Sequence, residues 1–405
     1  MLPTEALDAL GTAEGRQNPY PFYEAIREHG NLVPLKKGRL VAVGYAECDK
    51  ALREPKLHVQ DGKSYDVIYP NWRRHSSIRA FTSSMLYSNP PQHGRLRGTV
   101  SFAFTPPRVQ QLRSVIETMA DSLLDRMADL GADGSPVDII AEFASRLPIA
   151  VISGMLGFPA EDQVWFRDMA STVAVSTDGF TDPAALVKAD QAMDELSAYF
   201  EELLAQRRRE PADDLVTMLA RIHDADGEKL SHEELMGNMM VLLTAGFETT
   251  SFLIGHGVMI ALERNEYARR LRTEPPFSVG YVEEILRYEP PVHVTSRWAS
   301  TDIELLGTPI PAGSKLILIL AAGNRDPRRF SEANTFNPDR NDSQPLSFGA
   351  GGHFCLGAPL ARLEAQIALP RLLRRFPNLY ATETPTYRDR WVVRGLDTFP
   401  IAIGL

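Results

Sequence analysis

A glycine-rich segment towards the C-terminal end surrounds one of the two cysteines of the chain. In Phe348-Gly-Ala-Gly-Gly-His-Phe-Cys-Leu-Gly357, four glycines flank Cys355, and helical spacing of apolar residues follows over 355–376. A thiolate at a helix N-terminus is stabilised by the helix dipole and by free backbone N–H groups, and glycines let the backbone approach a flat, bulky partner. The pattern therefore favours Cys355 as a thiolate ligand of a metal. The alternative is a small buried residue, which we expect for Cys48 because it lies in a helical pattern.

The same segment resembles the cysteine-loop signature of the cytochrome P450 superfamily, F-x-x-G-x-[R/H]-x-C-x-G. The residues that match in register are Phe348, Gly351, His353, Cys355 and Gly357. The resemblance implies that Cys355 is the axial ligand of a haem b iron. It also implies haem contacts from Phe348, Gly349, His353 and Gly357 in this loop and from Ala245 elsewhere in the chain. A hydrolase with Cys355 as nucleophile is the alternative, but no third residue that would orient His353 is identifiable.

A second motif lies inside the longest predicted helix. Ser231-His-Glu-Glu234 is a capping box, and the apolar pattern after it runs to about residue 262. Within it, Ala245-Gly-Phe-Glu-Thr-Thr250 resembles the oxygen-activation motif of the superfamily, A-G-x-[D/E]-T-T. Glycine and threonine weaken and bend a helix, which makes room for water and dioxygen. The resemblance implies that Thr249 donates a hydrogen bond and Glu248 passes protons inward; a core helix that merely tolerates glycine is the alternative.

Two further groups of charged residues fit the same resemblance. Glu284 and Arg287 form an E-x-x-R pair on one helix face, and Arg340 supplies the downstream arginine that this pair binds in the family. Buried haem propionates require charge-assisted partners. The residues expected to bind them are His93, Arg97, Arg297 and His353.

The elements that must position these residues are mainly helical, with a smaller β part from both ends of the chain. Periodicity predicts helices over 21–29, 45–53, 110–130, 183–209, 231–262 and 355–376, and strands over 32–35, 40–43, 292–298, 303–305 and 315–320. Residues 59–90 are expected to be irregular because glycine and proline interrupt them.

The resemblance implies the triangular, mainly α prism of the superfamily, with haem between the long central helix and the cysteine-loop helix. It predicts a single domain over 1–405. The β-rich part is expected at about 31–43, 292–320 and 380–405, and the helical part at about 91–290 and 355–376.

Composition is typical of a soluble globular protein. Of 405 residues, 44% are hydrophobic and 23% charged, which is neither a disordered nor a coiled-coil composition. A net charge of −9 gives no reason to expect nucleic acid binding, and two cysteines exclude a disulfide framework. The apolar runs are far shorter than the roughly 20 residues of a membrane span. We expect a cytoplasmic protein that is not bound to a membrane.

The function that the resemblance implies is a haem-thiolate monooxygenase. It would activate dioxygen and hydroxylate or epoxidise a largely apolar small molecule, such as a polyketide or macrolide of secondary metabolism and antibiotic biosynthesis. Soluble bacterial members take electrons from a ferredoxin and its reductase, so these are the expected protein partners. Peroxygenation, rearrangement, oxidative coupling and a haem-binding sensor are alternatives. The intact Glu248–Thr249 pair favours monooxygenation over them.

Two surfaces can be assigned by position. Helical spacing back from Thr249 gives a stripe that is apolar near the iron and polar at its far end. The residues expected to contact substrate are Asn238, Val241, Leu242, Ala245, Val294 and Val392. An acidic ferredoxin must overcome the negative net charge of the chain, so we expect a local basic patch. Its expected members are Arg108, Arg113 and Arg362.

Overall fold

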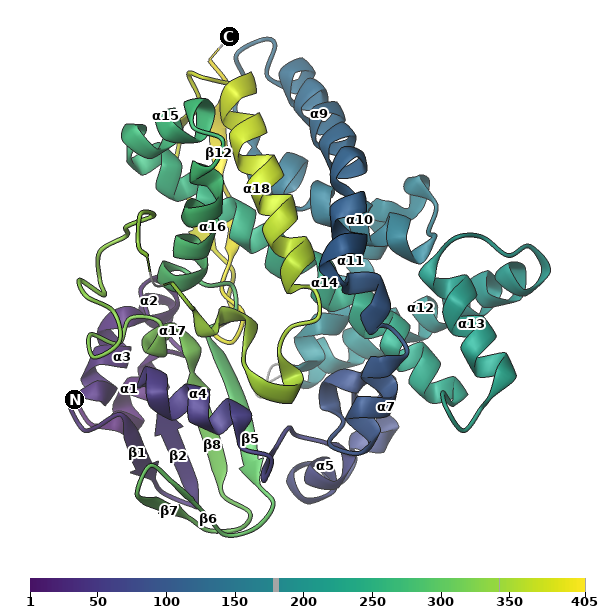
Figure 1. Ribbon diagram of the computed structural model, residues 1–405, viewed down its shortest axis with the longest axis vertical. Coiled ribbons are helices and arrows are strands. Elements are labelled where there is room, and N and C mark those ends of the chain that lie inside the picture. The colour runs from purple at the N-terminus through teal and green to yellow at the C-terminus, as the bar shows by residue number, and fades with distance from the viewer. Residues whose placement is uncertain (178–181, 342, 405) are drawn as a thin grey trace. The chain divides into compact units, whose positions relative to one another are not determined.

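The chain divides into two units in the computed structural model, which describes residues 1–177, 182–341 and 343–404 (Figure 1). The first unit comprises Met1–His58, Ser114–Arg146 and Thr249–Leu405, and the second comprises Val59–Arg113 and Leu147–Glu248. The mainly helical class with a smaller β part is confirmed. The single domain over 1–405 stays a prediction.

Strands from both ends of the chain meet in one sheet of the first unit. Its order is β1 (Leu32–Leu35), β2 (Arg39–Ala42), β8 (Lys315–Ile319), β5 (Val294–Ala299) and β3 (Leu57–His58). β2 and β8 are parallel, with Leu40 opposite Leu316, whereas all other neighbours are antiparallel. The predicted strands are therefore confirmed, with ends that differ by one or two residues.

Alternation along these strands gives the sheet two apolar faces. Leu40 and Leu316 pack with Cys48 of α4 (Tyr45–Arg53), and α4 lies across the strands in Figure 1. Val41 and Ile319 point the other way, into a cluster with residues of α1 (Pro3–Ala9) and α3 (Tyr20–Arg27). Cys48 is fully buried, and this burial raises the pKa of its thiol. Cys48 is thus a core residue, as predicted.

The rest of the first unit consists of helices and short strands. The helices are α2 (Ala13–Gln17), α9 (Arg113–Leu130), η4 (Ile140–Ala144), α15 (Asn265–Thr273), α16 (Phe277–Tyr288), α17 (Leu320–Gly323) and α18 (Ala358–Arg375). The strands are β4 (Val137–Asp138), β6 (Ile303–Leu305), β7 (Thr308–Ile310), β9 (Tyr380–Ala381), β10 (Thr386–Tyr387), β11 (Leu396–Thr398) and β12 (Pro400–Ala402). The predicted helix over 110–130 is divided, because α8 ends at Gln111 and α9 begins at Arg113.

The second unit is helical. It holds α7 (Gln92–Gly98), η3 (Ser101–Phe104), α8 (Pro106–Gln111), α10 (Arg146–Leu156), η5 (Ala160–Asp162), α11 (Gln163–Ala174), η6 (Val175–Thr177), α12 (Pro183–Arg209) and α13 (Leu215–Ala225). The predicted limits of α12 are those of the structure.

The prediction that residues 59–90 are irregular is wrong. They form α5 (Gly62–Ile68), η1 (Trp72–Arg74), α6 (Ser76–Thr82) and η2 (Met85–Tyr87). Asp61 caps the first of these helices, because its side chain accepts the Ser64 N–H at 2.9 Å. Trp72 and Ile78 then pack with Leu186 of α12, which gives the segment a small apolar core.

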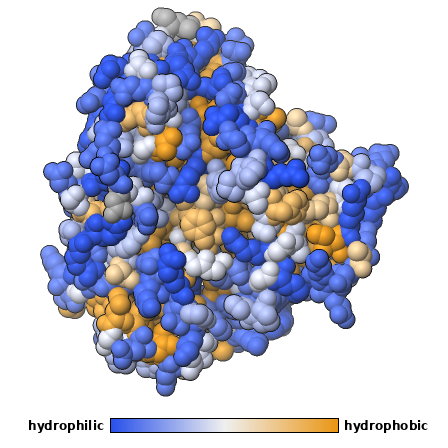
Figure 2. All heavy atoms as spheres, viewed as in Figure 1, coloured by the Kyte–Doolittle hydropathy of each residue, from blue (hydrophilic) through white to orange (hydrophobic). Residues whose placement is uncertain are grey.

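The long helix α14 (His232–Glu263) runs from the second unit into the first. Its capping box is confirmed: Ser231 Oγ accepts the Glu234 N–H at 3.3 Å, and Glu234 Oε2 accepts the Ser231 N–H at 2.9 Å. Among the described residues, α14 is the one helix long and apolar enough to cross a membrane, and 72% of its apolar window is buried inside the protein. Such burial is also what a core helix shows. On the face seen in Figure 2, hydrophilic residues predominate and apolar ones form small groups.

Candidate active site

The loop that carries Cys355 is shaped by two short helices of the first unit, η7 (Leu346–Phe348) and η8 (Gly351–His353). The Cys355 N–H donates to the Phe348 carbonyl at 2.8 Å, which closes the loop, and the Cys355 side chain is exposed. Glycine is required at Gly351, where φ is +69° and a Cβ atom would lie 2.7 Å from the Leu52 carbonyl oxygen. The glycines therefore serve the turn itself and leave the thiol accessible.

The helix after Cys355 begins later than predicted. The first helical residue of α18 is Ala358, and Pro359 in the first turn needs no N–H partner there. The Cys355 carbonyl accepts the Ala358 N–H at 3.5 Å, so the cysteine directly precedes the helix. The predicted start at Cys355 is thus corrected by three positions, with Leu356 and Gly357 between the cysteine and the helix, and the thiol still lies next to the helix N-terminus.

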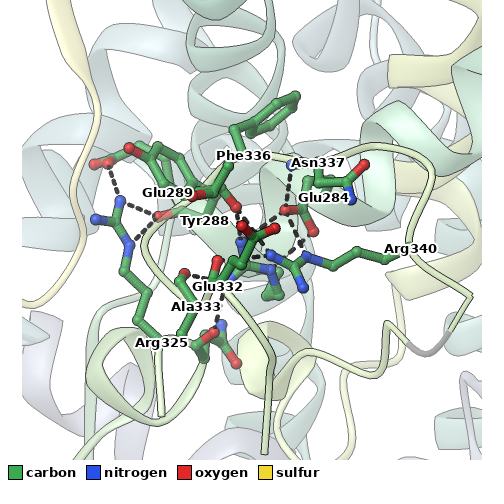
Figure 3. Close-up of polar contacts among 12 residues, drawn as sticks. Glu284, Tyr288, Glu289, Arg325, Glu332, Ala333, Phe336, Asn337 and Arg340 are labelled. Carbon is green, nitrogen blue, oxygen red and sulfur yellow. Dashed lines mark hydrogen bonds and ion pairs between the residues drawn. The ribbon is translucent and has the colours of Figure 1, made fainter. Parts of the chain in front are cut away.

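A buried ion triad lies on the same unit, and it confirms the pairing expected for Glu284, Arg287 and Arg340 (Figure 3). Arg287 donates to Glu284 at 2.6 and 2.8 Å, and Arg340 Nε donates to Glu284 Oε1 at 3.1 Å. The remaining guanidinium donors reach backbone carbonyls of 324–335, and the Asn337 N–H donates to Glu284 at 2.8 Å. Because Glu284 and Arg287 are at most 1% exposed, this triad fixes α16 to the 324–340 segment.

Asn324 connects this triad to the cysteine loop. Its backbone carbonyl accepts from Arg287 at 3.0 Å, and its side-chain oxygen accepts the Leu346 N–H at 2.7 Å. Its amide nitrogen donates to Ser347 Oγ at 2.9 Å, and Ser347 in turn donates to the Leu286 carbonyl. The start of η7 is thus tied to the ion triad through a single buried amide. Asn324 leaves no motif in the sequence, because it binds the triad through its own backbone carbonyl and the loop partly through the Leu346 N–H.

Arg297 is a buried cation on β5. Its side chain is nearly enclosed at 5% exposure, and its Nη1 donates to the Ser296 carbonyl at 2.8 Å and to Thr295 Oγ1 at 3.3 Å. No carboxylate among residues 1–177, 182–341 and 343–404 forms an ion pair with Arg297, and burial lowers its pKa to about 10. A buried guanidinium with neutral partners alone is a site that an anion would stabilise, and a haem propionate fits it.

Two other expected propionate ligands lie on α7 of the second unit. His93 is buried and Arg97 half-buried; burial and the charge of Arg97 lower the pKa of His93. α7 is fixed to the start of α14, since Arg95 donates to Glu234 at 2.5 and 2.9 Å. Burial opposes ionisation of Glu234, but hydrogen bonds from Arg95, the Ser231 backbone and Gln92 lower its pKa to about 2. His353, the fourth expected ligand, is half-buried in η8 of the first unit.

The oxygen-activation motif lies in an unbroken stretch of α14. Residues 241–244 and Phe247 are buried, whereas Ala245 is exposed and Thr249 is half-exposed. Glu248 is 5% exposed. Gly246 lies against Ile152 of α10, where a Cβ atom would be 3.0 Å from its side chain. Small residues thus make α14 narrow at the point where its sequence carries an acid and a threonine.

The expected substrate residues differ in accessibility. Ala245 is exposed, but Val241, Leu242 and Val294 are buried, and Val392 is half-buried. Asn238 is fully buried, and its Oδ1 accepts the Met85 N–H at 2.9 Å. In this structure Asn238 therefore anchors the turn at 84–88, and its oxygen is already used. The stripe stays a prediction, with Ala245 as its accessible member.

One expected member of the basic patch, Arg362, has its charge paired in the structure. Arg362 donates to Glu283 at 2.5 and 3.0 Å, and its guanidinium lies 4.5 Å from the centre of the Phe348 ring. Its charge is therefore paired, and its packing steadies the cysteine loop. Arg108 and Arg113 are exposed on the second unit.

A charged network in the first unit had no sequence signal. Glu289 accepts from Arg394 at 2.6 Å and lies 3.5 Å from Arg325, and these charges lower its pKa to about 2 against the effect of burial. It borders a cavity of about 490 Å³ whose lining includes Tyr20, Met259 and Glu263. None of the residues that line this cavity belongs to the cysteine loop, so it is separate from the thiol.

Comparisons with known proteins agree with this geometry. The cytochrome P450 family model matches residues 11–394. Over 98% of its length the chain is 37% identical to the cytochrome P450 monooxygenase PikC of Streptomyces venezuelae, of which it covers 94%. It is 36% identical to the vitamin D(3) 25-hydroxylase of Pseudonocardia autotrophica, with 96% of this chain and 94% of that protein covered.

Among solved structures, P450BioI in complex with an acyl carrier protein ligated to hexadec-9Z-enoic acid is similar, with a TM-score of 0.87 and 33% identity. The alignment covers 96% of this chain and 100% of that one. An accessible cysteine in a glycine-lined loop, a buried arginine for a propionate and the ion triad behind the loop are features that a haem-thiolate protein needs. The chain therefore belongs to the cytochrome P450 family of haem-thiolate monooxygenases, and its cofactor is haem b.

Proposed function

We propose that this monooxygenase hydroxylates or epoxidises a largely apolar small molecule, a secondary metabolite of the polyketide or macrolide kind, in the bacterial cytoplasm. The observation that carries the proposal is the accessible Ala245 within an otherwise buried apolar stretch of α14, one turn before Thr249. A ligand held against that surface meets apolar groups first. The acid–threonine pair that favours monooxygenation follows immediately in the chain.

Two of the similar proteins support an apolar substrate by their names. One is a vitamin D(3) 25-hydroxylase, and another was solved with a hexadec-9Z-enoic acid carrier complex. A secosteroid and a long acyl chain share little beyond extended apolar surface. We therefore infer an apolar substrate from what these proteins have in common, and the secondary-metabolite class is the finer part of the proposal.

Each site residue has a proposed task. Haem, when bound, supplies the iron at which dioxygen is activated for insertion into a C–H or C=C bond. Cys355 ligates the iron, and Arg297, His93, Arg97 and His353 hold the propionates. The Thr249 hydroxyl would donate a hydrogen bond to the bound oxygen ligand, while Glu248, at 5% exposure, would pass protons inward to it.

A ferredoxin is the proposed electron donor. Since the net charge of −9 opposes association with an acidic protein, docking requires a local basic surface. Arg108 and Arg113 are exposed candidates, and Arg362, which pairs with Glu283, is less accessible. We expect Arg113→Glu to slow the first electron transfer and to weaken its salt dependence. An unchanged rate and salt slope would place the docking surface elsewhere.

The test has two steps. First, the reduced protein under carbon monoxide should show the strongly red-shifted Soret band of thiolate ligation; Cys355→His should lose that band, and Cys48→Ser should keep it. Second, a panel of macrolides, secosteroids and fatty acids is screened by the spin-state shift, and each binder is incubated with ferredoxin, reductase and dioxygen. Oxygenated macrolide products support the finer proposal, whereas turnover confined to the other two classes contradicts it.

A further inference from the structure

The cavity beside Glu289 is lined by the first unit alone and by no residue assigned to the haem. One wall is the last turn of α14, where Met259 and Glu263 lie one helical turn apart on one face. The other wall comes from the end of α16, at Tyr288 and Glu289, and from Arg325. The volume of about 490 Å³ is within the range of about 300–1,000 Å³ of sites that take up small molecules. The cavity is therefore large enough for an organic ligand.

The buried end of this cavity carries an excess of positive charge. Glu289 accepts from Arg394 at 2.6 Å and lies 3.5 Å from Arg325, so one carboxylate faces two guanidinium groups. Two buried histidines beside Glu289 add no charge at pH 7. Burial lowers the pKa of His256 to about 4 and lowers that of His293 well below its usual range. One positive charge is therefore left without a carboxylate at this end.

Arg325 has an unused donor at the same end. Its guanidinium packs on the rings of Tyr20 and Tyr288, 3.3 and 3.7 Å from their centroids, and Arg325 is only 7% exposed. Its Nε and Nη2 donate to the Tyr288 carbonyl at 3.0 and 2.6 Å (Figure 3). Its Nη1 has no acceptor among the residues that the structure describes. A guanidinium that is fixed, buried and short of an acceptor favours an anionic group on a ligand.

The opposite charge lies at the rim of the cavity. Glu263 is exposed to solvent, and its carboxylate forms no hydrogen bond or ion pair with residues 1–177, 182–341 and 343–404. Partial burial and the charge of Glu289 raise the pKa of Glu263, against the effect of Arg264, so Glu263 lies close to Glu289. Glu24, the remaining acidic residue of the lining, is paired with Arg27. The rim therefore offers a carboxylate that a cationic group would pair with.

We propose that this cavity binds a zwitterionic amino acid with a bulky apolar side chain. Its carboxylate accepts from Arg325 Nη1, its ammonium group donates to Glu263, and its side chain packs on Met259 and Ile260 of α14. An amino acid carries both charges on one carbon atom, which suits a rim carboxylate that lies close to the buried charges. A ligand with a single charge would satisfy only one end. The inference does not depend on the proposed function.

The bound amino acid would also support the segment behind the cysteine loop. Arg325 follows Asn324, whose side-chain oxygen accepts the Leu346 N–H of that loop at 2.7 Å. Tyr288 follows Arg287 of the ion triad, and Figure 3 shows Tyr288 and Arg325 beside that triad. A ligand that binds only the folded protein stabilises the parts that it contacts. We therefore expect occupancy to slow hydrogen exchange of the 324–335 amides.

The experiment compares three probes that share a phenyl group and differ in charge. Phenylalanine carries both charges, phenethylamine has only the ammonium group, and 3-phenylpropanoate has only the carboxylate. Isothermal titration calorimetry on the holoprotein gives the Kd of each, and the haem absorption is recorded alongside, because an amine bound to the iron would shift it. Glu263→Gln removes the rim charge, and Met259→Trp fills the apolar wall. Glu266→Gln, an exposed glutamate outside the cavity, is the matched control.

We expect phenylalanine to bind at least about tenfold more tightly than either other probe, because each of these lacks one charge-assisted contact. The haem absorption should not shift with phenylalanine. Glu263→Gln should weaken phenylalanine binding about tenfold and leave 3-phenylpropanoate binding unchanged, since only the ammonium group meets Glu263. Met259→Trp should abolish phenylalanine binding and its effect on the 324–335 amides, and Glu266→Gln should behave like the wild type.

Three results would overturn the proposal. One is no binding of phenylalanine at about 10 mM, where a Kd of about 1 mM would already fill most sites. Another is an equal affinity for all three probes. The third is an unchanged phenylalanine affinity in Glu263→Gln, which decides the matter even if Met259→Trp does not fold. A shift of the haem absorption that accompanies phenylalanine binding and persists in Met259→Trp would place the ligand at the iron and count against the cavity.

Discussion

Replacing Arg297 with methionine should change the stability of the haem-free and haem-loaded protein in opposite directions. Burial lowers the pKa of Arg297 from 12.5 to about 10, and no carboxylate among the described residues compensates its charge. At pH 7 the guanidinium is charged both folded and unfolded. A shift of this size at 1.36 kcal/mol per pKa unit corresponds to a burial cost of about 3 kcal/mol in the haem-free protein. Methionine has a similar length and carries no charge, so this cost disappears.

A propionate reverses the sign, because it supplies the anion that the buried cation lacks. The assay compares denaturant unfolding of haem-free wild type, Arg297→Met and Arg297→Lys at pH 7, and then the rate at which each loaded protein gives up haem to an acceptor. We expect haem-free Arg297→Met to be more stable by about 1–3 kcal/mol and to lose haem at least about tenfold faster. If haem-free Arg297→Met is instead less stable than the haem-free wild type, another group compensates the charge of Arg297 and the reasoning fails.

Three other substitutions test separate parts of the site. Glu284→Gln leaves buried Arg287 without its carboxylate, so it should cost about 3–5 kcal/mol of unfolding free energy and most of the bound haem. The control is Glu283→Gln, at the next position on α16, which breaks a more exposed ion pair and should cost under about 1 kcal/mol. Thr249→Ala should keep ligand binding but divert at least about tenfold more electrons to hydrogen peroxide, measured against product formed. Burial lowers the pKa of His256 to about 4, so between about pH 6.5 and 4 the unfolded chain binds a proton at His256 and the folded chain does not. The wild type should therefore lose about 2 kcal/mol of unfolding free energy through this residue between pH 7 and 5, and His256→Asn should not show that part of the loss.

Those elements whose limits the sequence defined well carry strong local signals. α12 starts at a proline in its first turn and ends in three arginines, and α14 starts at a capping box. α4 was also placed correctly at Tyr45–Arg53. These signals act within one or two helical turns. Tertiary contacts did not have to be known to find them.

Errors arose where a distant residue decides the local structure. The segment 59–90 looked irregular, yet Leu186 and Asp190 of α12 stabilise the short helices there. Asn238, whose substrate contact stays a prediction, also has a distant partner, because the Met85 N–H donates to its side-chain oxygen. Neither partner could be inferred from periodicity, because each lies more than a hundred residues away.

The expected motifs around Cys355 and Thr249 could be recognised because the residues of each are close together in sequence. Partners with no side-chain signature escaped notice. Asn324 joins the ion triad to the cysteine loop largely through backbone groups. The roles assigned to the propionate and substrate residues stay predictions that the proposed experiments address.

The parallel pairing of β2 with β8 also has a consequence for how the chain is made. Residue 42 leaves the ribosome about 280 residues before residue 319, which at 5–20 residues per second is a delay of roughly 15–55 s. During this time the β1–β2 hairpin has an unpaired edge, and a two-stranded hairpin is only marginally stable in water. The N-terminal region therefore cannot complete its sheet as it emerges and must await residues 315–319. Cys355 is made later still, so the sheet can form before the haem ligand is available, and chaperones that shield exposed strand edges should raise the yield of this protein.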